Sequence, residues 1–247
     1  NPVIVIPARL AATRFPDKPL ADIVGDPMIV HVWRRAVEAS IGPVIVAAGD
    51  QEIADAISDA GGETVMTDAN LPSGSDRVHQ ALERYDPTRQ HDAVINVQGD
   101  LPTIDPGMIA SVLDPFEEPT VDITTMAVEI VEDRERTDPN VVKVVIALAD
   151  GKARIGRALY FSRSTVPSTP DGPHYHHIGL YGFRRDALER FVALEPGGLE
   201  TQERLEQLRA LEAGMRIDVA LVDTVPIGVD TPEDLDRARA FVTAGSC

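Results

Sequence analysis

The chain has 247 residues, of which 43% are hydrophobic, so it can bury a substantial core. No apolar run approaches the ~20 residues needed to cross a membrane, and we expect no membrane partner. The net charge of −17 repels nucleic acid and anionic lipid, which excludes nucleic acid as a partner.

The cysteine content points to a reducing compartment. The chain has one cysteine, Cys247, so an intrachain disulfide is excluded. The first residues lack the length and the basic flank of a signal peptide. We therefore expect a cytoplasmic protein.

A cationic loop follows the first predicted strand. Residues 3–6 form an apolar run bounded by prolines, which is typical of a buried strand. The next residues, 7–20, contain three prolines and are unlike a helix. They carry three cations, Arg9, Arg14 and Lys18, against Asp17 alone. Three cations after the first strand predict a phosphate-binding loop, with a solvated basic loop as the alternative. The loop matches neither G-x-G-x-x-G nor the Walker pattern, so hydride transfer and NTPase activity lack their fingerprint.

Strands and helices then alternate, as in a doubly wound parallel α/β sheet. Apolar runs predict strands, and apolar residues at helical spacing predict helices. Glycines and prolines separate these segments. The predicted strands are residues 44–48, 64–67 and 94–97, and the predicted helices are residues 28–40, 51–60, about 78–85 and 108–113.

The strand at residues 94–97 places a carboxylate where open α/β sheets bind their ligands. Gly99 lets the backbone turn sharply, and Asp100 follows at the carboxyl end of the strand. A carboxylate in this position can hold Mg²⁺, the usual companion of nucleotide phosphates. An ordinary polar turn is the alternative. Upstream, Ser73 or Ser75 can cap a helix, or the same polar groups can bind a base or ribose.

From about residue 120 the strands are no longer separated by long helices. Residues 121–130, 141–148 and 159–162 are strand-like, and Asp150-Gly151 predicts a hairpin turn. We expect a single domain, residues 1–247, with an antiparallel excursion at about 120–183. A protruding ribbon of this kind needs a partner surface, which predicts a homodimer.

Three histidines, His174, His176 and His177, precede a predicted strand at residues 178–183. Successive strand residues face opposite sides, so three ligands on one ion would be awkward. No Cys or Glu-x-x-His pattern supports zinc. A polar ligand contact, best assigned to His177, is favoured over a metal site.

The last third of the chain returns to helices. Residues 187–194 and 199–213 predict helices, and residues 217–222 predict a strand. Thr231 and Pro232 are typical of the start of the final helix. Asp230 stands just before this cap, so helix chemistry does not explain it.

These motifs together resemble the 3-deoxy-manno-octulosonate cytidylyltransferase (CMP-Kdo synthetase) family, in family order across the whole chain. The matching segments are Ile6-Pro7-Ala8-Arg9, Thr13-Arg14-Phe15-Pro16-Asp17-Lys18-Pro19-Leu20, Pro27-Met28-Ile29-Val30-His31-Val32, Ser73-Gly74-Ser75-Asp76-Arg77, Asn96-Val97-Gln98-Gly99-Asp100, Asp138-Pro139-Asn140-Val141-Val142-Lys143-Val144-Val145, Leu159-Tyr160-Phe161-Ser162-Arg163, Ile178-Gly179-Leu180-Tyr181-Gly182-Phe183, Leu205-Glu206-Gln207-Leu208-Arg209 and Gly228-Val229-Asp230-Thr231-Pro232-Glu233-Asp234-Leu235.

The resemblance implies a CTP-dependent cytidylyltransferase with a Rossmann-like, mostly parallel sheet of the nucleotide-diphospho-sugar transferase type. It implies that Asp100 and Asp230 bind Mg²⁺ and form the catalytic set with Arg9 and Lys18. The implied nucleotide-binding residues are Pro7, Ala8, Arg9, Arg14, Lys18, Ser73, Gly74, Arg77 and Gln98. The implied residues of the pocket for a small acidic acceptor are Gln98, Arg163, His177, Tyr181, Glu206 and Gln207.

Two departures from the family pattern bear on the acceptor. Leu101 stands where the family usually has Glu, and residues 164–176 form a shorter segment without the usual Pro-Trp. The expected function is CMP transfer to 3-deoxy-manno-octulosonate with release of pyrophosphate. The alternatives are CMP transfer to another acid, such as phosphonoformate, and a non-catalytic nucleotide-binding protein.

Overall fold

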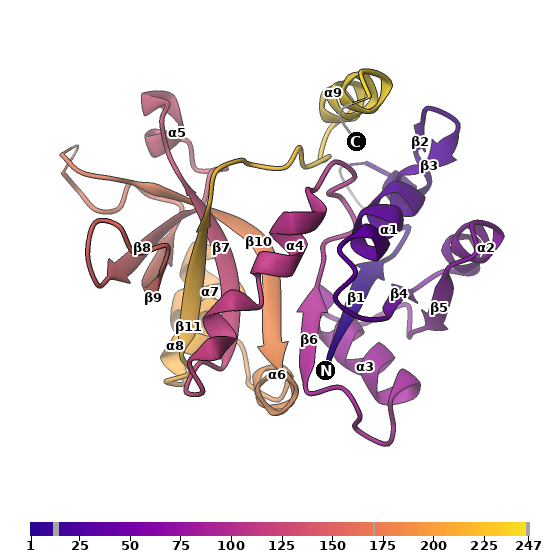
Figure 1. The fold of residues 1–247 in the computed structure, drawn as a ribbon, viewed down its shortest axis with the longest axis horizontal. Helices are drawn as coiled ribbons and strands as arrows, with labels where there is room; N and C mark the ends of the chain where they lie inside the picture. The colour runs from indigo at the N-terminus through magenta and orange to yellow at the C-terminus, as the bar shows by residue number, and fades with distance from the viewer. Residues whose placement is uncertain (12–14, 170, 246–247) are drawn as a thin grey trace. The chain divides into compact units, whose positions relative to one another are not determined.

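The computed structural model describes residues 1–11, 15–169 and 171–245. The chain divides into two compact units (Figure 1). The first unit comprises Asn1–Ala110 and Pro226–Cys247, and the second unit comprises Ser111–Val225. Among the described residues, no helix has both the length and the apolar character needed to cross a membrane.

The first unit is built on parallel strands. Its strands are β1 (Pro2–Ala8), β4 (Val44–Ala48), β5 (Glu63–Met66) and β6 (Ala93–Asn96), in the order β5-β4-β1-β6. Each neighbouring pair is parallel. Residues 3–6 of β1 are fully buried, although successive side chains face opposite sides, so both faces of this strand are covered. The strands predicted from continuous apolar runs are confirmed here.

Helices and short segments flank these strands (Figure 1). They are η1 (Lys18–Leu20), β2 (Asp22–Ile23), β3 (Asp26–Pro27), α1 (Met28–Glu38), α2 (Gln51–Asp59), α3 (Gly74–Tyr85), α4 (Pro106–Ser111) and α9 (Pro232–Thr243). The last helix belongs to this unit because its apolar residues pack on the segment that follows the cationic loop. Ile23, Met28, Val229, Leu235 and Ala238 form that buried cluster.

The second unit has mixed strand pairing. Its strands are β7 (Ile123–Glu129), β8 (Lys143–Leu148), β9 (Ile155–Ser162), β10 (Tyr175–Arg184) and β11 (Ile217–Val222), in the order β10-β7-β11-β9-β8. Strands β7 and β11 are parallel, and the other described pairs in this unit are antiparallel. The α/β class is therefore confirmed, with a mixed sheet rather than a mostly parallel one.

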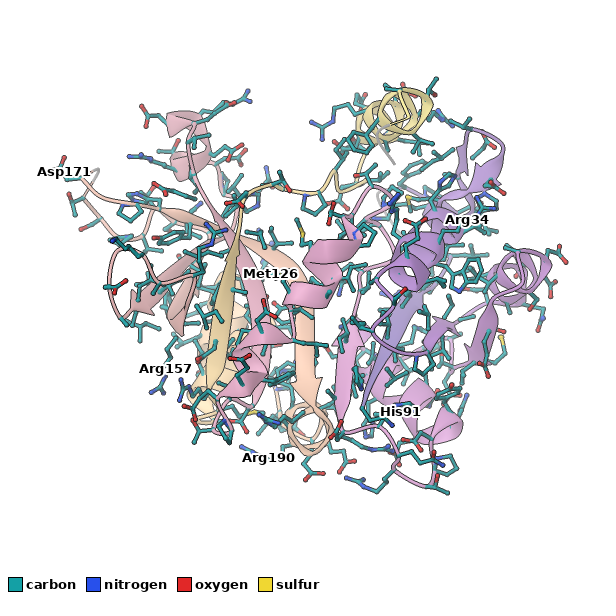
Figure 2. All side chains as sticks on the ribbon, viewed as in Figure 1. Arg34, His91, Met126, Arg157, Asp171 and Arg190 are labelled. Atoms are coloured by element: carbon teal, nitrogen blue, oxygen red, sulfur yellow. The ribbon has the colours of Figure 1, made fainter. Side chains whose placement is uncertain are left out.

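Short helices complete the second unit: η2 (Asp114–Glu117), α5 (Asp133–Thr137), α6 (Arg185–Val192), α7 (Gly198–Glu203) and α8 (Leu208–Glu212). The single helix predicted at residues 199–213 is wrong, because the chain breaks at Arg204, where φ is 56°. Figure 2 labels Met126, which is buried on β7, and Arg157, which is exposed on β9. The core of this unit also encloses polar side chains, among them Thr125, Lys143 and His177.

Candidate functional site

The carboxyl ends of β1, β4 and β6 meet at one edge of the first unit because these strands are parallel. A pocket of about 440 Å³ is lined by residues from the end of β1 and the loop after it, from the segments that follow β5 and β6, and by Asp230. The predicted site residues that line it are Pro7, Ala8, Arg9, Lys18, Ser73, Gly74, Arg77, Gln98, Asp100 and Asp230. Ala11, Phe15, Pro19 and Gly99 also line it, and the sequence pattern does not predict them as site residues. Arg14 lies outside the described residues.

The ammonium of Lys18 joins the two predicted metal-binding carboxylates. Lys18 Nζ lies 3.0 Å from Asp100 Oδ2 and 3.2 Å from Asp230 Oδ1. It also donates a hydrogen bond to the carbonyl oxygen of Val229, at 2.8 Å. Two carboxylates that are 130 positions apart in the sequence therefore share one cation.

Backbone contacts bring these carboxylates together. The amide of Val229 donates to the carbonyl oxygen of Asp100 at 3.0 Å, and the Val229 side chain is fully buried in the cluster that holds α9. Thr231 caps α9 in a capping box with Asp234, and Asp234 Oδ2 also accepts from the amide of Asp230 at 3.1 Å. The helix start therefore holds the backbone of Asp230 and leaves its carboxylate for the pocket.

The oxygen atoms around Lys18 fit a hard divalent cation. Carboxylate and carbonyl oxygens are the ligands that Mg²⁺ prefers, and Mg²⁺ is commonly bound by one or two carboxylates together with substrate phosphates. The described part of the chain contains no group of three or more His, Cys, Asp or Glu side chains arranged for a metal. A magnesium ion at Asp100 and Asp230 would therefore need oxygen atoms from a ligand or water to complete its coordination.

Close backbone packing shapes the floor of the pocket. A Cβ at Gly99 would lie 3.0 Å from the carbonyl oxygen of Pro7, so a side chain there would press on the end of β1. The neighbouring Gln98 donates through Nε2 to Asn96 Oδ1 at 3.1 Å. Glycine at position 99 therefore lets the segment before Asp100 cross close to β1.

Two arginines give the pocket its positive charge. Arg9 is exposed, whereas Arg77, on α3, is 2% exposed. Arg77 donates to Thr67 Oγ1 and to the carbonyl oxygen of Ala69. Burial lowers the pKa of Arg77, and the positive charge of Arg9 lowers it further. Asp50 and Asp68 act in the opposite direction. Positive charge that lines a pocket favours an anionic ligand.

Ser73 has a structural role at the start of α3. Ser73 is the N-cap, and its Oγ accepts from the amide of Asp76 at 3.1 Å. The same hydroxyl donates to Asp76 Oδ2 at 2.7 Å. Ser73 and Gly74 nevertheless line the pocket, so the structure allows both the capping and the ligand-binding interpretations.

Three of the predicted acceptor residues, His177, Tyr181 and Glu206, lie close together in the second unit. The rings of His177 and Tyr181 on β10 have centroids 5.5 Å apart. Burial raises the pKa of Tyr181, and the nearby carboxylate of Glu206 raises it further. Gln207 is 7% exposed, and its buried Nε2 has no hydrogen-bond partner in the described structure.

Arg163, the other predicted acceptor residue of this unit, is held by backbone oxygens. Its side chain donates to the carbonyl oxygens of Glu203 and Pro139, each at 3.0 Å, and to that of Arg204 at 3.4 Å. Its amide donates to Glu203 Oε2 at 3.0 Å. Arg163 thus connects three segments of the second unit, and acceptor binding by its guanidinium stays a prediction.

His177 is buried in a way that keeps its ring neutral. Its Nε2 lies 2.9 Å from Thr125 Oγ1, and its ring packs edge-on against Phe161 at 4.9 Å between centroids. The Thr125 hydroxyl is also within 3.1 Å of two carbonyl oxygens, so its single hydrogen goes to a carbonyl and the imidazole N–H is the donor. Burial lowers the pKa of His177 to about 3.

The low pKa of His177 makes stability depend on pH. The unfolded histidine, with a pKa near 6.5, binds a proton below that pH, whereas the folded one stays neutral until about pH 3. The stabilisation is complete above pH 6.5 and is lost progressively as the pH falls toward 3. We expect His177 alone to lower the free energy of unfolding by about 2 kcal/mol between pH 7.5 and pH 5.

Urea unfolding at pH 7.5 and pH 5 measures this effect in wild type and His177→Gln. The variant should lose about 2 kcal/mol less than wild type over the same interval. Equal losses in the two proteins would show that His177 is not the buried neutral group described here.

Comparison with known proteins identifies the family. Residues 3–217 match the family model described as "Cytidylyltransferase". A 3-deoxy-manno-octulosonate cytidylyltransferase from Paramagnetospirillum magneticum is 63% identical over 244 residues, covering 99% of this chain and 98% of that relative. One from Rhodospirillum rubrum is 63% identical over 242 residues, covering 98% and 95%.

A solved structure agrees with these relatives. The structure of a CMP:2-keto-3-deoxy-manno-octonic acid synthetase complexed with CTP matches with a TM-score of 0.90 and 36% identity, covering 99% of both chains. A cytidylyltransferase from Leptospira borgpetersenii, 14% identical with a TM-score of 0.63 and covering 98% and 87%, shares the fold. The chain therefore belongs to the 3-deoxy-manno-octulosonate cytidylyltransferase family.

Proposed function

We propose that this enzyme transfers CMP from CTP to 3-deoxy-manno-octulosonate and releases pyrophosphate. One observation carries the proposal: Lys18 binds both Asp100 and Asp230 in a cationic pocket at the carboxyl ends of parallel strands. This arrangement favours the binding of a nucleoside triphosphate by a Rossmann-like core. The relatives at 63% identity support the acceptor, and neither phosphonoformate nor a non-catalytic role is favoured.

The reaction joins an acceptor oxygen to the α-phosphorus of CTP and breaks the bond to the leaving pyrophosphate. The protein mainly has to position the two anions and offset their repulsion. Arg9 and Lys18 would contact the triphosphate and stabilise the departing pyrophosphate. Arg77, Ser73 and Gly74 would hold the cytidine end.

We infer Mg²⁺ as the cofactor, held by Asp100 and Asp230. When bound, it supplies positive charge to the phosphate oxygens and lowers the barrier to attack by an anionic acceptor. The carboxylates that now bind Lys18 would then release its ammonium to the phosphates. In this proposal Lys18 binds Asp100 and Asp230 in the free enzyme and the phosphates of CTP in the complex.

The predicted acceptor residues are Gln98, Arg163, His177, Tyr181, Glu206 and Gln207. An oxygen atom of the bound sugar acid would accept a hydrogen bond from Gln207 Nε2, whose buried N–H has no partner in the described structure and is costly to leave unpaired. Leu101, where the family usually has an acid, is 9% exposed and cannot contribute a charge. We infer that acceptor binding does not depend on a carboxylate at position 101.

Pyrophosphate release measured with CTP and a panel of acids tests the proposed function. We expect Mg²⁺-dependent turnover with 3-deoxy-manno-octulosonate and at least about tenfold less with phosphonoformate or with ATP in place of CTP. Faster turnover of phosphonoformate would assign a different acceptor. Binding of CTP without turnover of any acid would indicate a non-catalytic protein.

The single-domain organisation, the homodimer and the cytoplasmic location stay predictions. Ile155 and Leu159 share one exposed face of β9 and support a dimer, because large apolar side chains on one face favour a partner. Light scattering of the purified protein tests this point. A mass twice that of one chain is expected, and a monomer would contradict it.

A further inference from the structure

Arg77 is a buried cation that forms no direct ion pair with any described residue, although the charges of Asp50 and Asp68 act on it. It is 2% exposed and lines the pocket, yet it takes part in none of the ion pairs of the described residues. Its two terminal nitrogens donate to neutral oxygens, Thr67 Oγ1 and the Ala69 carbonyl. The direction in which this guanidinium points therefore depends on two hydrogen bonds rather than on an ion pair.

Thr67 can hold that direction because its own hydrogen is already committed. Thr67 follows β5 and is 5% exposed. Its hydroxyl lies 3.0 Å from the carbonyl oxygen of Ala48, to which it donates, and its amide donates to the same oxygen at 2.8 Å. A hydroxyl has one hydrogen, so the remaining Oγ1 lone pairs face Arg77 as acceptors.

Gly49 provides the space in which the guanidinium lies. A Cβ at position 49 would be 2.8 Å from Arg77 Nη1 and 3.1 Å from its Cζ. It would also lie 3.2 Å from the Cβ of Arg9. Gly49 is not among the residues with positive φ, so an alanine there would strain these contacts and not its own backbone. Position 49 follows Ala48, the residue that fixes the Thr67 hydroxyl.

We propose that Thr67 is a positioning residue for nucleotide binding, acting through Arg77, and that Gly49 keeps the place of that guanidinium free. The inference rests on the proposed function, in which CTP occupies this pocket. Thr67 would not touch the nucleotide. It would keep the Arg77 charge aimed at the nucleotide through a neutral hydrogen bond, whereas a carboxylate in direct contact would compete with an anionic ligand.

The variant Thr67→Val tests the proposal because it keeps the shape of the side chain and removes only the hydroxyl. The backbone amide of residue 67 still satisfies the Ala48 carbonyl, so folding should be preserved. We expect the KM for CTP and the Kd for CTP from titration calorimetry to rise about tenfold, the loss typical of one charged hydrogen bond. The kcat and the KM for the acceptor should stay within about twofold of wild type, because Arg77 is not at the reacting atoms.

Two further variants separate positioning from general destabilisation. Thr67→Ser keeps the hydroxyl and should restore the KM for CTP to near wild type. Gly49→Ala should raise the KM for CTP at least as much as Thr67→Val, because its Cβ displaces Arg77 and also presses on Arg9. Matched controls are Thr64→Val, on β5 outside the pocket lining, and Gly151→Ala, where a Cβ would meet nothing within 4 Å.

The outcomes distinguish this inference from the proposed function. A wild-type protein that does not bind CTP overturns both. If the wild-type protein binds CTP, three results would overturn the inference alone. These are a Thr67→Val variant with an unchanged Kd, a Thr67→Val variant with a lower kcat and an unchanged KM, and a failure of Thr67→Ser to restore CTP binding. A tenfold weaker Kd that serine restores supports it.

Discussion

Replacing Asp100 with asparagine should lower kcat about a thousandfold while leaving the fold intact. The substitution removes one of the two negative charges that bind Lys18 and that we propose for Mg²⁺. Asparagine keeps the shape of the side chain but offers a neutral amide, a far weaker ligand for a divalent cation. Pyrophosphate release at saturating CTP and acceptor measures the loss.

Folding should change little in this variant because Lys18 keeps Asp230 and the Val229 carbonyl as partners. Asp100 is partly exposed, and we expect the free energy of unfolding to change by less than about 1 kcal/mol. Asp59→Asn, an exposed position on α2, is the matched control and should retain full turnover. Wild-type turnover in Asp100→Asn would exclude the proposed role of this carboxylate.

The largest effect on stability is expected at Lys143, at the start of β8. This lysine is fully buried, and its Nζ donates to the carbonyl oxygens of Asp138, Val141 and Arg163 at 2.8, 2.6 and 2.7 Å. Three acceptors require three N–H donors, so the side chain is the charged ammonium. Burial lowers the pKa of Lys143, but Asp138 opposes that shift.

Lys143→Met should lower the free energy of unfolding by about 3 kcal/mol and the melting temperature by roughly 10 °C. Methionine fills a similar volume but removes the ammonium donor from three partly buried carbonyl groups, of which that of Asp138 keeps the amide of Val141 as a donor. Calorimetry of the variant measures this cost. The matched control is Lys152→Met in the exposed turn between β8 and β9, which should leave the melting temperature unchanged, and equal melting temperatures for the two variants would contradict the prediction.

The strands were the part of the fold most readily predicted from the sequence. Residues 44–48 and 217–222 were predicted with their observed bounds, because a buried strand shows as a short continuous apolar run. The Asp150-Gly151 turn correctly predicted the antiparallel pair β8 and β9. The parallel pairing of β7 with β11 could not be predicted, because pairing partners far apart in sequence leave no local signal.

The broken helix at residues 199–213 shows where local pattern fails. Nothing at Arg204, neither glycine nor proline, marks a helix end. The break is favoured by a distant residue: Arg163 donates to the carbonyl oxygens of Glu203 and Arg204, which a continuous helix would use internally. Tertiary hydrogen bonds thus override helical periodicity here.

Some parts of the candidate site could be predicted from local sequence, and others depend on tertiary contacts. Asp100 could be predicted as a site residue because it comes after a buried strand. The cationic loop could be predicted because three positive charges lie close together in the sequence. The meeting of Asp100 with Asp230 depends on a backbone hydrogen bond from Val229, which no local pattern reveals. Thr67 and Gly49 had no signal either, because a threonine or a glycine after a strand is common in any α/β protein.

A crystal structure of the chain with CTP, Mn²⁺ in place of Mg²⁺ and an unreactive acceptor analogue most directly tests the central claim. Anomalous scattering locates the manganese ion independently of the protein atoms. We expect the ion within bonding distance of both Asp100 and Asp230 and of a CTP phosphate, with Lys18 turned toward the phosphates. An ion bound elsewhere, or CTP bound outside the pocket while Lys18 still joins the two carboxylates, would contradict the claim.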